Sequence, residues 1–434
     1  MKRFSILVIS VAALLAFGVL ATFGDDDATL TFWGWPYTIS VIQANMDAFG
    51  EAYPSIEVTL VEMTVGDLYQ NLLLAHQAGQ GAPDVVILET KNIAQYVDVG
   101  ALTDITDHVV PFVADFDPSK WPPMVRDGRY FGIPVDSGPV AMFYRSDLFE
   151  QANLPTDPAD VAAALQTWDD YYDAAAAIKD ATGAYMLAYA DFNYDERILE
   201  TLLQQRGISY VDFEDNITIN SPEAVATLEY VGKLVADGYA QNAPAWFDEW
   251  YAGIAEGEVA TIVSAVWLGG FLRSWIAPDL EGLWRVAELP AWELGGARTS
   301  NSGGSNYAIC EQSTQKAAAW TFIEFMSLRT ESLINKLQAM DEFPSLFTVY
   351  ANPFFDEGVP YFGNQTYYRF FSELVPEIPA WRYTAHYAEF NSQLTSEVEA
   401  YLHGSKSAKE ALDTVAQYIS SNYPEFALKY PCKE

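Results

Sequence analysis

The chain has 434 residues, half of them hydrophobic, and a formal net charge of −36. A protein this acidic repels the phosphate backbone of nucleic acids and the headgroups of anionic lipids. We therefore expect no nucleic-acid partner. Its length exceeds the ~250 to 300 residues of a usual single hydrophobic core, which predicts two lobes.

The N-terminus has the pattern of a secretory signal peptide. Lys2 and Arg3 precede an apolar run over residues 4–20, and small residues follow up to Gly24. This order is typical of a leader that is removed on export. The run is also long enough for an uncleaved anchor, so that alternative stays open. We expect residues 1–24 to be the signal peptide of a periplasmic or secreted protein.

Strands and helices alternate over the next part of the chain. Apolar periodicity and turn residues predict strands at residues 30–33, 56–60 and 84–88, with helices at 40–53, capped by Ser40, and at 68–77. Such alternation packs helices on a mostly parallel sheet. Ligands of these sheets bind beyond the carboxyl ends of the strands, which points to Trp33, Trp35 and Glu89.

A succession of motifs follows in a fixed order. After GAPDVVILE at residues 81–89 comes DGRYFGIPVDSGPVAMFYRSDLFEQANL at residues 127–154, and then FDEWYAGIAEGEVATIVSAVWLGGFL, SGGSNYAICEQSTQKAAAWTFIEFMS and HGSKSAKEALDTVAQYI. Together these segments resemble the extracellular solute-binding proteins, family 1, of ABC importers, of the maltose- and multiple-sugar-binding type. Glu256 and Thr261 depart from that pattern, which usually has Lys and Met.

The resemblance implies an α/β fold of the type II periplasmic-binding-protein class, with two lobes joined by a hinge of crossing strands. The crossings are expected near residues 136–140, 286–290 and 327–330. The implied lobes are discontinuous in sequence: lobe 1 comprises residues 25–137 and 288–328, and lobe 2 comprises residues 138–287 and 329–434.

The resemblance also implies a binding protein rather than an enzyme, without a cofactor. It would be a monomer that closes on a mono- or oligosaccharide and delivers it to membrane permease subunits of an ABC importer. Sugars suit a chain with 12 Trp and 26 Tyr, because aromatic rings stack on sugar faces while carboxylates and Arg hold hydroxyls. A polyamine, a glycerol phosphate derivative or a peptide remains an alternative ligand. A purely sensory role and a secreted carbohydrate-active enzyme also remain open.

Candidate ligand-binding residues come from positions at which relatives place binding groups. Each also has a structural explanation: core packing for the tryptophans, a helix cap or hinge bond for the carboxylates, a turn for the glycines and a surface ion pair for the arginine. The candidates are Trp33, Trp35, Glu89, Asp136, Trp267, Gly303, Gly304 and Arg382, with Asp191 and Trp246 from loops expected at the cleft edge of lobe 2.

Other chemistries find no support in the sequence. H-E-x-x-H, C-x-x-C, G-x-S-x-G and P-loop motifs are all missing, so we expect no metal, no serine hydrolase of that type and no nucleotide hydrolysis. DFEDN at residues 212–216 lacks the later Gly and Glu of a calcium loop and is expected to form a turn. Whether Cys310 and Cys432 pair is left open by the sequence.

Overall fold

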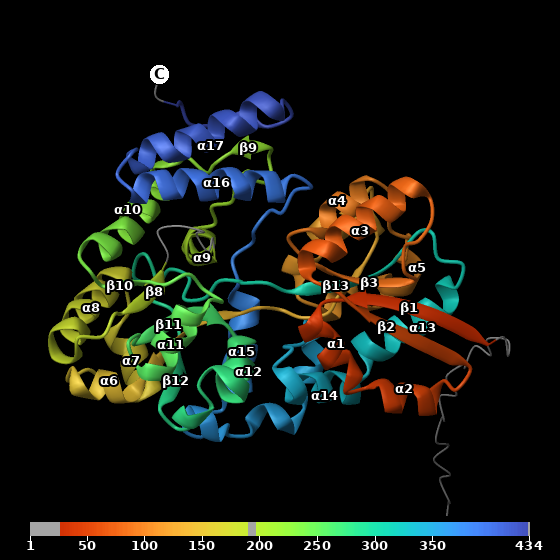
Figure 1. The fold of residues 1–434 in the computed structure, drawn as a ribbon, viewed down its shortest axis with the longest axis horizontal. Helices are drawn as coiled ribbons and strands as arrows, with labels where there is room; N and C mark the ends of the chain where they lie inside the picture. Colours follow the sequence, from red (N-terminus) through yellow and green to blue (C-terminus); the bar gives the residue numbers. More distant parts are fainter. Residues whose placement is uncertain (1–26, 190–196, 433–434) are drawn as a thin grey trace, which may run out of the picture.

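The computed structural model describes residues 27–189 and 197–432, which form two lobes side by side (Figure 1). The proposed signal peptide lies outside the described residues. Lobe 1, on the right of the figure, contains a sheet of order β2-β1-β3-β13-β6, and lobe 2 contains a sheet of order β11-β7-β12. The expected α/β class with two lobes is therefore confirmed.

Three parallel strands open the sheet of lobe 1: β2 (Ile56–Glu62), β1 (Ala28–Gly34) and β3 (Val85–Glu89). β13 (Ser305–Ile309) then pairs antiparallel with β3 and with β6 (Ile133–Pro134). Leu30 and Phe32 are fully buried on one face of β1, and the Phe32 ring packs 5.9 Å from Phe322 of α13 (Lys316–Leu328). The alternation of buried residues along β1 thus anchors the helices of this face.

The first helical segment differs from its prediction. Instead of one helix from Ser40, the chain forms α1 (Pro36–Gln43) and α2 (Met46–Ala52). Pro36 begins the first helix because its fixed φ suits the first helical turn. Asn45 interrupts the segment, since its buried side chain donates a hydrogen bond of 3.0 Å to the Ser332 carbonyl of α14 (Thr330–Met340).

Lobe 2 is built around β7 (Val140–Arg145), whose residues are all buried. It pairs antiparallel with β11 (Thr261–Ala265) and β12 (Trp284–Ala287). A further strand pair of this lobe is β8 (Leu187–Tyr189) with β10 (Ala240–Asn242). Around them lie α6 (Ser146–Gln151), α7 (Pro158–Ala164), α8 (Trp168–Thr182), α9 (Arg197–Gln205), α10 (Pro222–Ala236), α11 (Asp248–Glu256), α15 (Tyr367–Leu374), α16 (Tyr387–Leu402) and α17 (Ala408–Asn422).

Reciprocal caps fix where two helices of lobe 2 begin. Thr167 Oγ1 accepts the Asp170 N–H of α8 at 3.3 Å, and the Asp170 carboxylate accepts the Thr167 N–H at 2.8 Å. Ser407 and Glu410 make the same pair of bonds at the start of α17. Both sites satisfy backbone N–H groups that have no partner inside the helix, so local sequence alone defines these starts.

We infer that the first crossing runs between β6 of lobe 1 and β7 of lobe 2. The second comes later than expected. Residues 288–300 stay on lobe 2, because the Ala291 N–H donates to Gln166 O and Trp292 packs 6.1 Å from Trp168. The chain returns to lobe 1 beside the first crossing, where the Ser302 N–H donates to Gly138 O. Gly138 permits this approach, since a Cβ there would overlap the Ser302 carbonyl.

The third crossing also comes later than expected. α14 packs on lobe 1, where Tyr37 Oη donates to the Met340 carbonyl at 3.1 Å. The segment after α14 then joins the hinge, with the Ser137 N–H donating to Phe343 O and the Ser345 N–H to Val135 O. We infer from these contacts that lobe 1 comprises residues 27–137 and 301–340, in place of the expected 288–328.

The two cysteines do not form a disulfide with each other. Cys310 is buried at the end of β13, Cys432 is half-buried beside lobe 2, and both are free thiols.

The loop at residues 212–216 forms the expected turn, because Asp212 Oδ1 accepts the N–H groups of Glu214 and Asn216. Strand β9 (Asn216–Ile217) follows directly.

Candidate functional site

A cavity of about 410 Å³ lies between the lobes, directly over the hinge. Its lining comes from both lobes and from the crossing segments. Lobe 1 supplies Trp35, Tyr37, Val65, Glu89, Lys91 and Ser305; lobe 2 supplies Glu200, Thr201, Trp246, Trp267, Phe271 and Tyr383; the hinge supplies Asp136, Asn301, Ser302, Gly303 and Gly304. A molecule held here would contact both lobes at once.

Aromatic rings form the wall on lobe 2. The rings of Trp246 and Trp267 lie 5.8 Å apart at 33°, and Phe271 packs 5.9 Å from Trp246 and 6.0 Å from Trp267. Trp246 has φ +71°, a left-handed conformation that costs a large side chain about 1–3 kcal/mol and that clusters at functional sites. The wall offers broad flat faces to the cavity.

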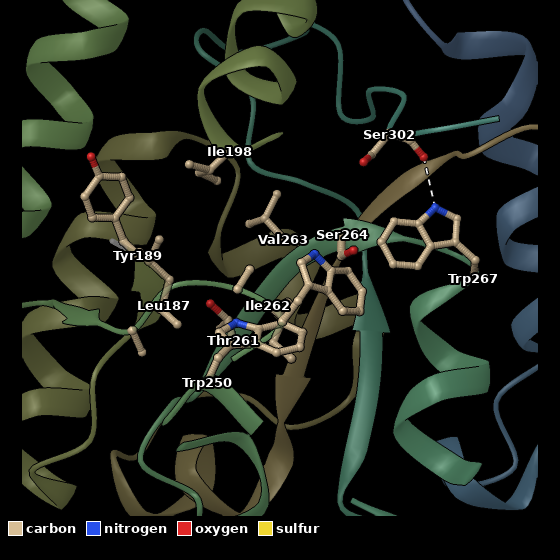
Figure 2. A pocket seen from close by; sticks show the side chains of 14 residues that line it. Leu187, Tyr189, Ile198, Trp250, Thr261, Ile262, Val263, Ser264, Trp267 and Ser302 are labelled. Atoms are coloured by element: carbon tan, nitrogen blue, oxygen red, sulfur yellow. Dashed lines mark hydrogen bonds between the residues drawn. The ribbon is translucent and has the colours of Figure 1, made fainter. Parts of the chain in front are cut away.

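Trp267 is held in position by a hydrogen bond to the hinge. Its indole Nε1 donates to the Ser302 carbonyl at 3.0 Å, and Figure 2 shows this bond beside the neighbouring side chains. A smaller cavity of about 70 Å³ adjoins the same ring and is lined mainly by apolar side chains, among them Leu187, Ile198 and Val263. The two cavities share Trp246, Trp267 and Ser302, so the aromatic wall lies between them.

Lobe 1 brings an aromatic residue and charged residues to strand ends. Trp35 directly follows β1 as the residue preceding α1, and Glu89 ends β3. Tyr69 Oη donates to Glu89 Oε2 at 2.8 Å, and Lys91 Nζ lies 3.8 Å from Glu89 Oε1. Burial, helped by the Glu89 charge, raises the pKa of Tyr69, so this phenol stays a neutral donor. The carboxylate of Glu89 is thereby held at the cavity edge.

Buried charges support the hinge floor. Asp136 Oδ1 accepts the Ser305 N–H at 2.7 Å. Burial raises the pKa of Asp136 to about 6, the charge of Glu342 adds to this rise, and Lys120 opposes it. Lys120 Nζ donates to Asn301 Oδ1 at 2.9 Å and to the Gly303 carbonyl at 3.3 Å, and burial lowers the pKa of Lys120.

Gly304 allows this arrangement to form. Its φ is +94°, which favours glycine, and a Cβ at this position would overlap Lys120 Nζ and come within 2.9 Å of the Asp136 carbonyl. The glycine pair therefore lets a buried lysine approach the backbone directly beneath the cavity.

Most of the residues predicted from the sequence meet in this cavity. Those that line it are Trp35, Glu89, Asp136, Trp246, Trp267, Gly303 and Gly304. Trp33 does not: it projects from the opposite face of β1 to Phe32 and packs half-buried against the core of lobe 1. Asp191 lies outside the described residues. What these residues do with a ligand stays a prediction.

Arg382 lies outside the cavity. Its guanidinium pairs with Asp215 at 2.6 Å and lines a separate cavity of about 470 Å³ that also includes Asp98 and Arg126. The next residue, Tyr383, lines both cavities. Arg382 thus has the surface ion pair that was its alternative explanation, and the neighbouring tyrosine takes the place expected for it.

Several cavity residues were not found by sequence reasoning. Phe271 follows Trp267 by four residues, a helical spacing that could have indicated it. Glu200 and Thr201 lie on α9, and their sequence carries no signal for a site. Glu200 accepts hydrogen bonds of 3.0 Å from Tyr210 Oη and Tyr387 Oη, so only the three-dimensional packing reveals its place.

The arrangement suits capture of a polar molecule with flat apolar faces. Aromatic rings can stack on such faces, while Glu89, Asp136 and the backbone near the glycine pair can hold its hydroxyl groups. Across residues 27–189 and 197–432, His, Cys, Asp and Glu form no group of three or more that could hold a metal ion. Within the same described ranges, no helix is both long and apolar enough to span a membrane.

Comparisons with known proteins agree with this geometry. The arabinooligosaccharide-binding protein of Halalkalibacterium halodurans is 28% identical over 368 residues, covering 82% of this chain and 79% of that protein. The lactose-binding protein of Rhizobium radiobacter is 25% identical and covers 91% of this chain and 93% of its own length.

Solved structures share the fold. An extracellular solute-binding protein of family 1 superposes with a TM-score of 0.77 at 25% identity, covering 90% of this chain and all (100%) of that one. An ABC-transporter-associated binding protein from B. animalis subsp. lactis, solved with β-1,6-galactobiose, has a TM-score of 0.78 at 23% identity, with coverage of 93% and 99%. Residues 44–361 match the family described as bacterial extracellular solute-binding protein, and the chain belongs to that family.

Proposed function

We propose that this protein is the substrate-binding component of an ABC importer and that it captures an oligosaccharide between its lobes. The observation that carries the proposal is the split cavity, in which the tryptophans of lobe 2 face Trp35 and Glu89 of lobe 1. Stacking surfaces on one side and charged acceptors on the other suit the two kinds of surface that a sugar presents. The ligand-binding residues would be Trp35, Glu89, Asp136, Trp246, Trp267, Gly303 and Gly304.

The named relatives support a sugar over the other ligands. Two of them are named for binding arabinooligosaccharide or lactose, and a structural neighbour holds a galactobiose. The cavity of about 410 Å³ lies within the range of ligand pockets, ≈ 300–1,000 Å³. A disaccharide or longer chain therefore fits the site better than a single ring.

Binding would close the lobes about the hinge. A ligand shifts the balance between open and closed forms only by its differential affinity for them. Because each lobe supplies part of the lining, the complete set of contacts forms only on closure, and closure would then be the signal that a membrane permease recognises. The protein would reach the cell exterior through its signal peptide and act there as a monomer without enzymatic activity.

A thermal-shift screen tests the proposal. The probes are arabino-, galacto- and malto-oligosaccharides, with a polyamine, glycerol phosphate and a peptide as controls. Ligand at 100 times its dissociation constant adds about 2.7 kcal/mol to stability, which raises the melting temperature by several degrees.

Two variants show whether a ligand binds in the cavity or elsewhere on the protein. Trp267→Ala should reduce the shift, whereas Arg382→Ala, outside the cavity, should retain it in full. A response to a control ligand alone would refute the sugar assignment. Steady turnover of an oligosaccharide would refute the binding-protein assignment.

A further inference from the structure

The aromatic wall continues beyond the cavity to the protein surface. Trp267, Phe271 and Trp275 follow one another at intervals of four residues, with ring centroids 6.0 Å and then 6.1 Å apart. Trp267 and Phe271 line the cavity, whereas Trp275 leaves 49% of its surface in solvent. The three rings therefore form an unbroken aromatic line from the cleft outward.

A change of helix type keeps these rings in line. Trp267 precedes α12 (Leu268–Phe271), and Trp275 lies in the π-helical turn η4 (Leu272–Ile276). Four residues of an α-helix overshoot one turn by about 40°, whereas four residues of a wider π turn fall short of one. The two deviations offset each other, so Trp275 returns to the side of the helix from which Trp267 projects. Such π turns occur frequently at functional sites.

A neighbouring helix supports the outer end of the line. The Tyr251 ring of α11 packs edge-on against Trp275, with centroids 4.9 Å apart at 68°. Tyr251 also contacts Trp250, which in turn contacts Trp246 of the cavity at 5.2 Å. Single exposed apolar residues need no explanation, but Trp275 ends a supported series that begins in the cavity.

We propose that Trp275 is an outer subsite, on which the distal sugar rings of an oligosaccharide stack after leaving the cavity past Phe271. The proposal rests on the function proposed for the cavity and deepens it, because it assigns a ligand longer than the cavity itself. Trp275 would add affinity only for chains long enough to reach it. The wall formed by Trp246 and Trp267 would bind the first rings of every chain.

Isothermal titration with oligosaccharides of two to six units tests this assignment. Arabino-, galacto- and malto-series are used so that one of them suits the cavity. With the native protein, affinity should rise with chain length. Trp275→Ala should remove that rise and weaken the binding of the longest chains about five- to tenfold, which is the order of one aromatic stacking contact. The affinity for disaccharides should change by less than about twofold. Trp275→Phe should keep part of the gain.

A matched control comes from Leu294, an apolar residue of lobe 2 that is 72% exposed and outside the aromatic line. Leu294→Ala should leave the whole length series unchanged. Leu294 lies mostly in solvent, whereas Trp275 also packs on Tyr251 and Phe271, so a melting curve of each variant checks that it still folds at the temperature of the titration.

The two proposals fail in different ways. If no series binds at all, the sugar-binding function is wrong, and the outer subsite falls with it. If sugars bind but length brings no gain, or Trp275→Ala weakens dimers and long chains equally, only the outer subsite is wrong. The same holds if long chains gain affinity that Trp275→Ala leaves intact, because they then leave the cavity in another direction, such as past Tyr383.

Discussion

Asp136 should make the stability of the ligand-free protein depend on pH. This carboxyl group is 8% exposed and accepts the Ser305 N–H. Burial is the main cause that raises its pKa to about 6, with a further contribution from Glu342, while Lys120 and Lys336 act in the opposite direction. In the unfolded chain, an aspartate titrates near 3.9. The native state therefore binds this proton more tightly than the unfolded state does.

The sign and size of the effect follow from that difference. Between pH 7 and pH 5 the native state takes up a proton that the unfolded state does not, so acidification stabilises the fold. At pH 5, below the native pKa, the gain from this group is on the order of 1 kcal/mol, and by pH 7 it has nearly vanished. The stabilisation by protonation is thus lost as the pH rises through about 6.

Asp136→Asn isolates this contribution. The amide oxygen can still accept the Ser305 N–H, but the side chain no longer titrates. Urea unfolding of both proteins at pH 5 and pH 7 gives the comparison, and titration of Asp341, whose pKa burial also raises to about 6, cancels in the difference. The native protein should gain about 1 kcal/mol more than the variant on going to pH 5. Equal changes in both proteins, or a larger gain in the variant, would refute the reasoning.

Three further substitutions test the site. Trp267→Ala should weaken oligosaccharide binding by about 1–3 kcal/mol in titration calorimetry, because it removes a stacking face and the indole hydrogen bond to the hinge. Unchanged affinity would exclude Trp267 from the site. Gly304→Ala should lower the free energy of unfolding by more than Gly295→Ala does. Both glycines have positive φ, but only at Gly304 would the added Cβ overlap Lys120. Equal losses in denaturant titrations would show that the overlap relaxes freely. Arg382→Ala should cost at most about 1 kcal/mol of stability, as expected for a partly exposed ion pair, and leave sugar affinity unchanged, so a large loss of affinity would return Arg382 to the site.

Strand topology made part of the site predictable. Trp35 and Glu89 follow strands of one sheet, and the carboxyl ends of such strands meet at one edge. Alternation places Trp33 on the face of β1 opposite Phe32, but it does not separate Trp33 from Trp35; Trp35 reaches the cavity because it lies beyond the end of the strand. The direction of a side chain in an irregular loop does not follow from sequence, and the structure places Tyr383, the neighbour of the predicted Arg382, at the cavity.

Long-range contacts decided what the local pattern could not. Residues 288–300 are kept on lobe 2 by the hydrogen bond from the Ala291 N–H to Gln166 O and by the packing of Trp292 against Trp168. The break between α1 and α2 likewise depends on Asn45 bonding to α14, far along the chain. Propensity is a weak guide where tertiary contacts of this kind intervene.

The backbone hydrogen bonds between the crossing segments restrict how the two lobes can move. The segment around residues 135–140 is bonded on one side to residues 300–305 and on the other to residues 343–345. Strands joined in this way cannot bend separately without breaking their ladder, so they move as one twisting ribbon. We therefore expect the lobes to rotate about one shared hinge, whose direction depends on the backbone bonds between the crossing segments and not on the ligand.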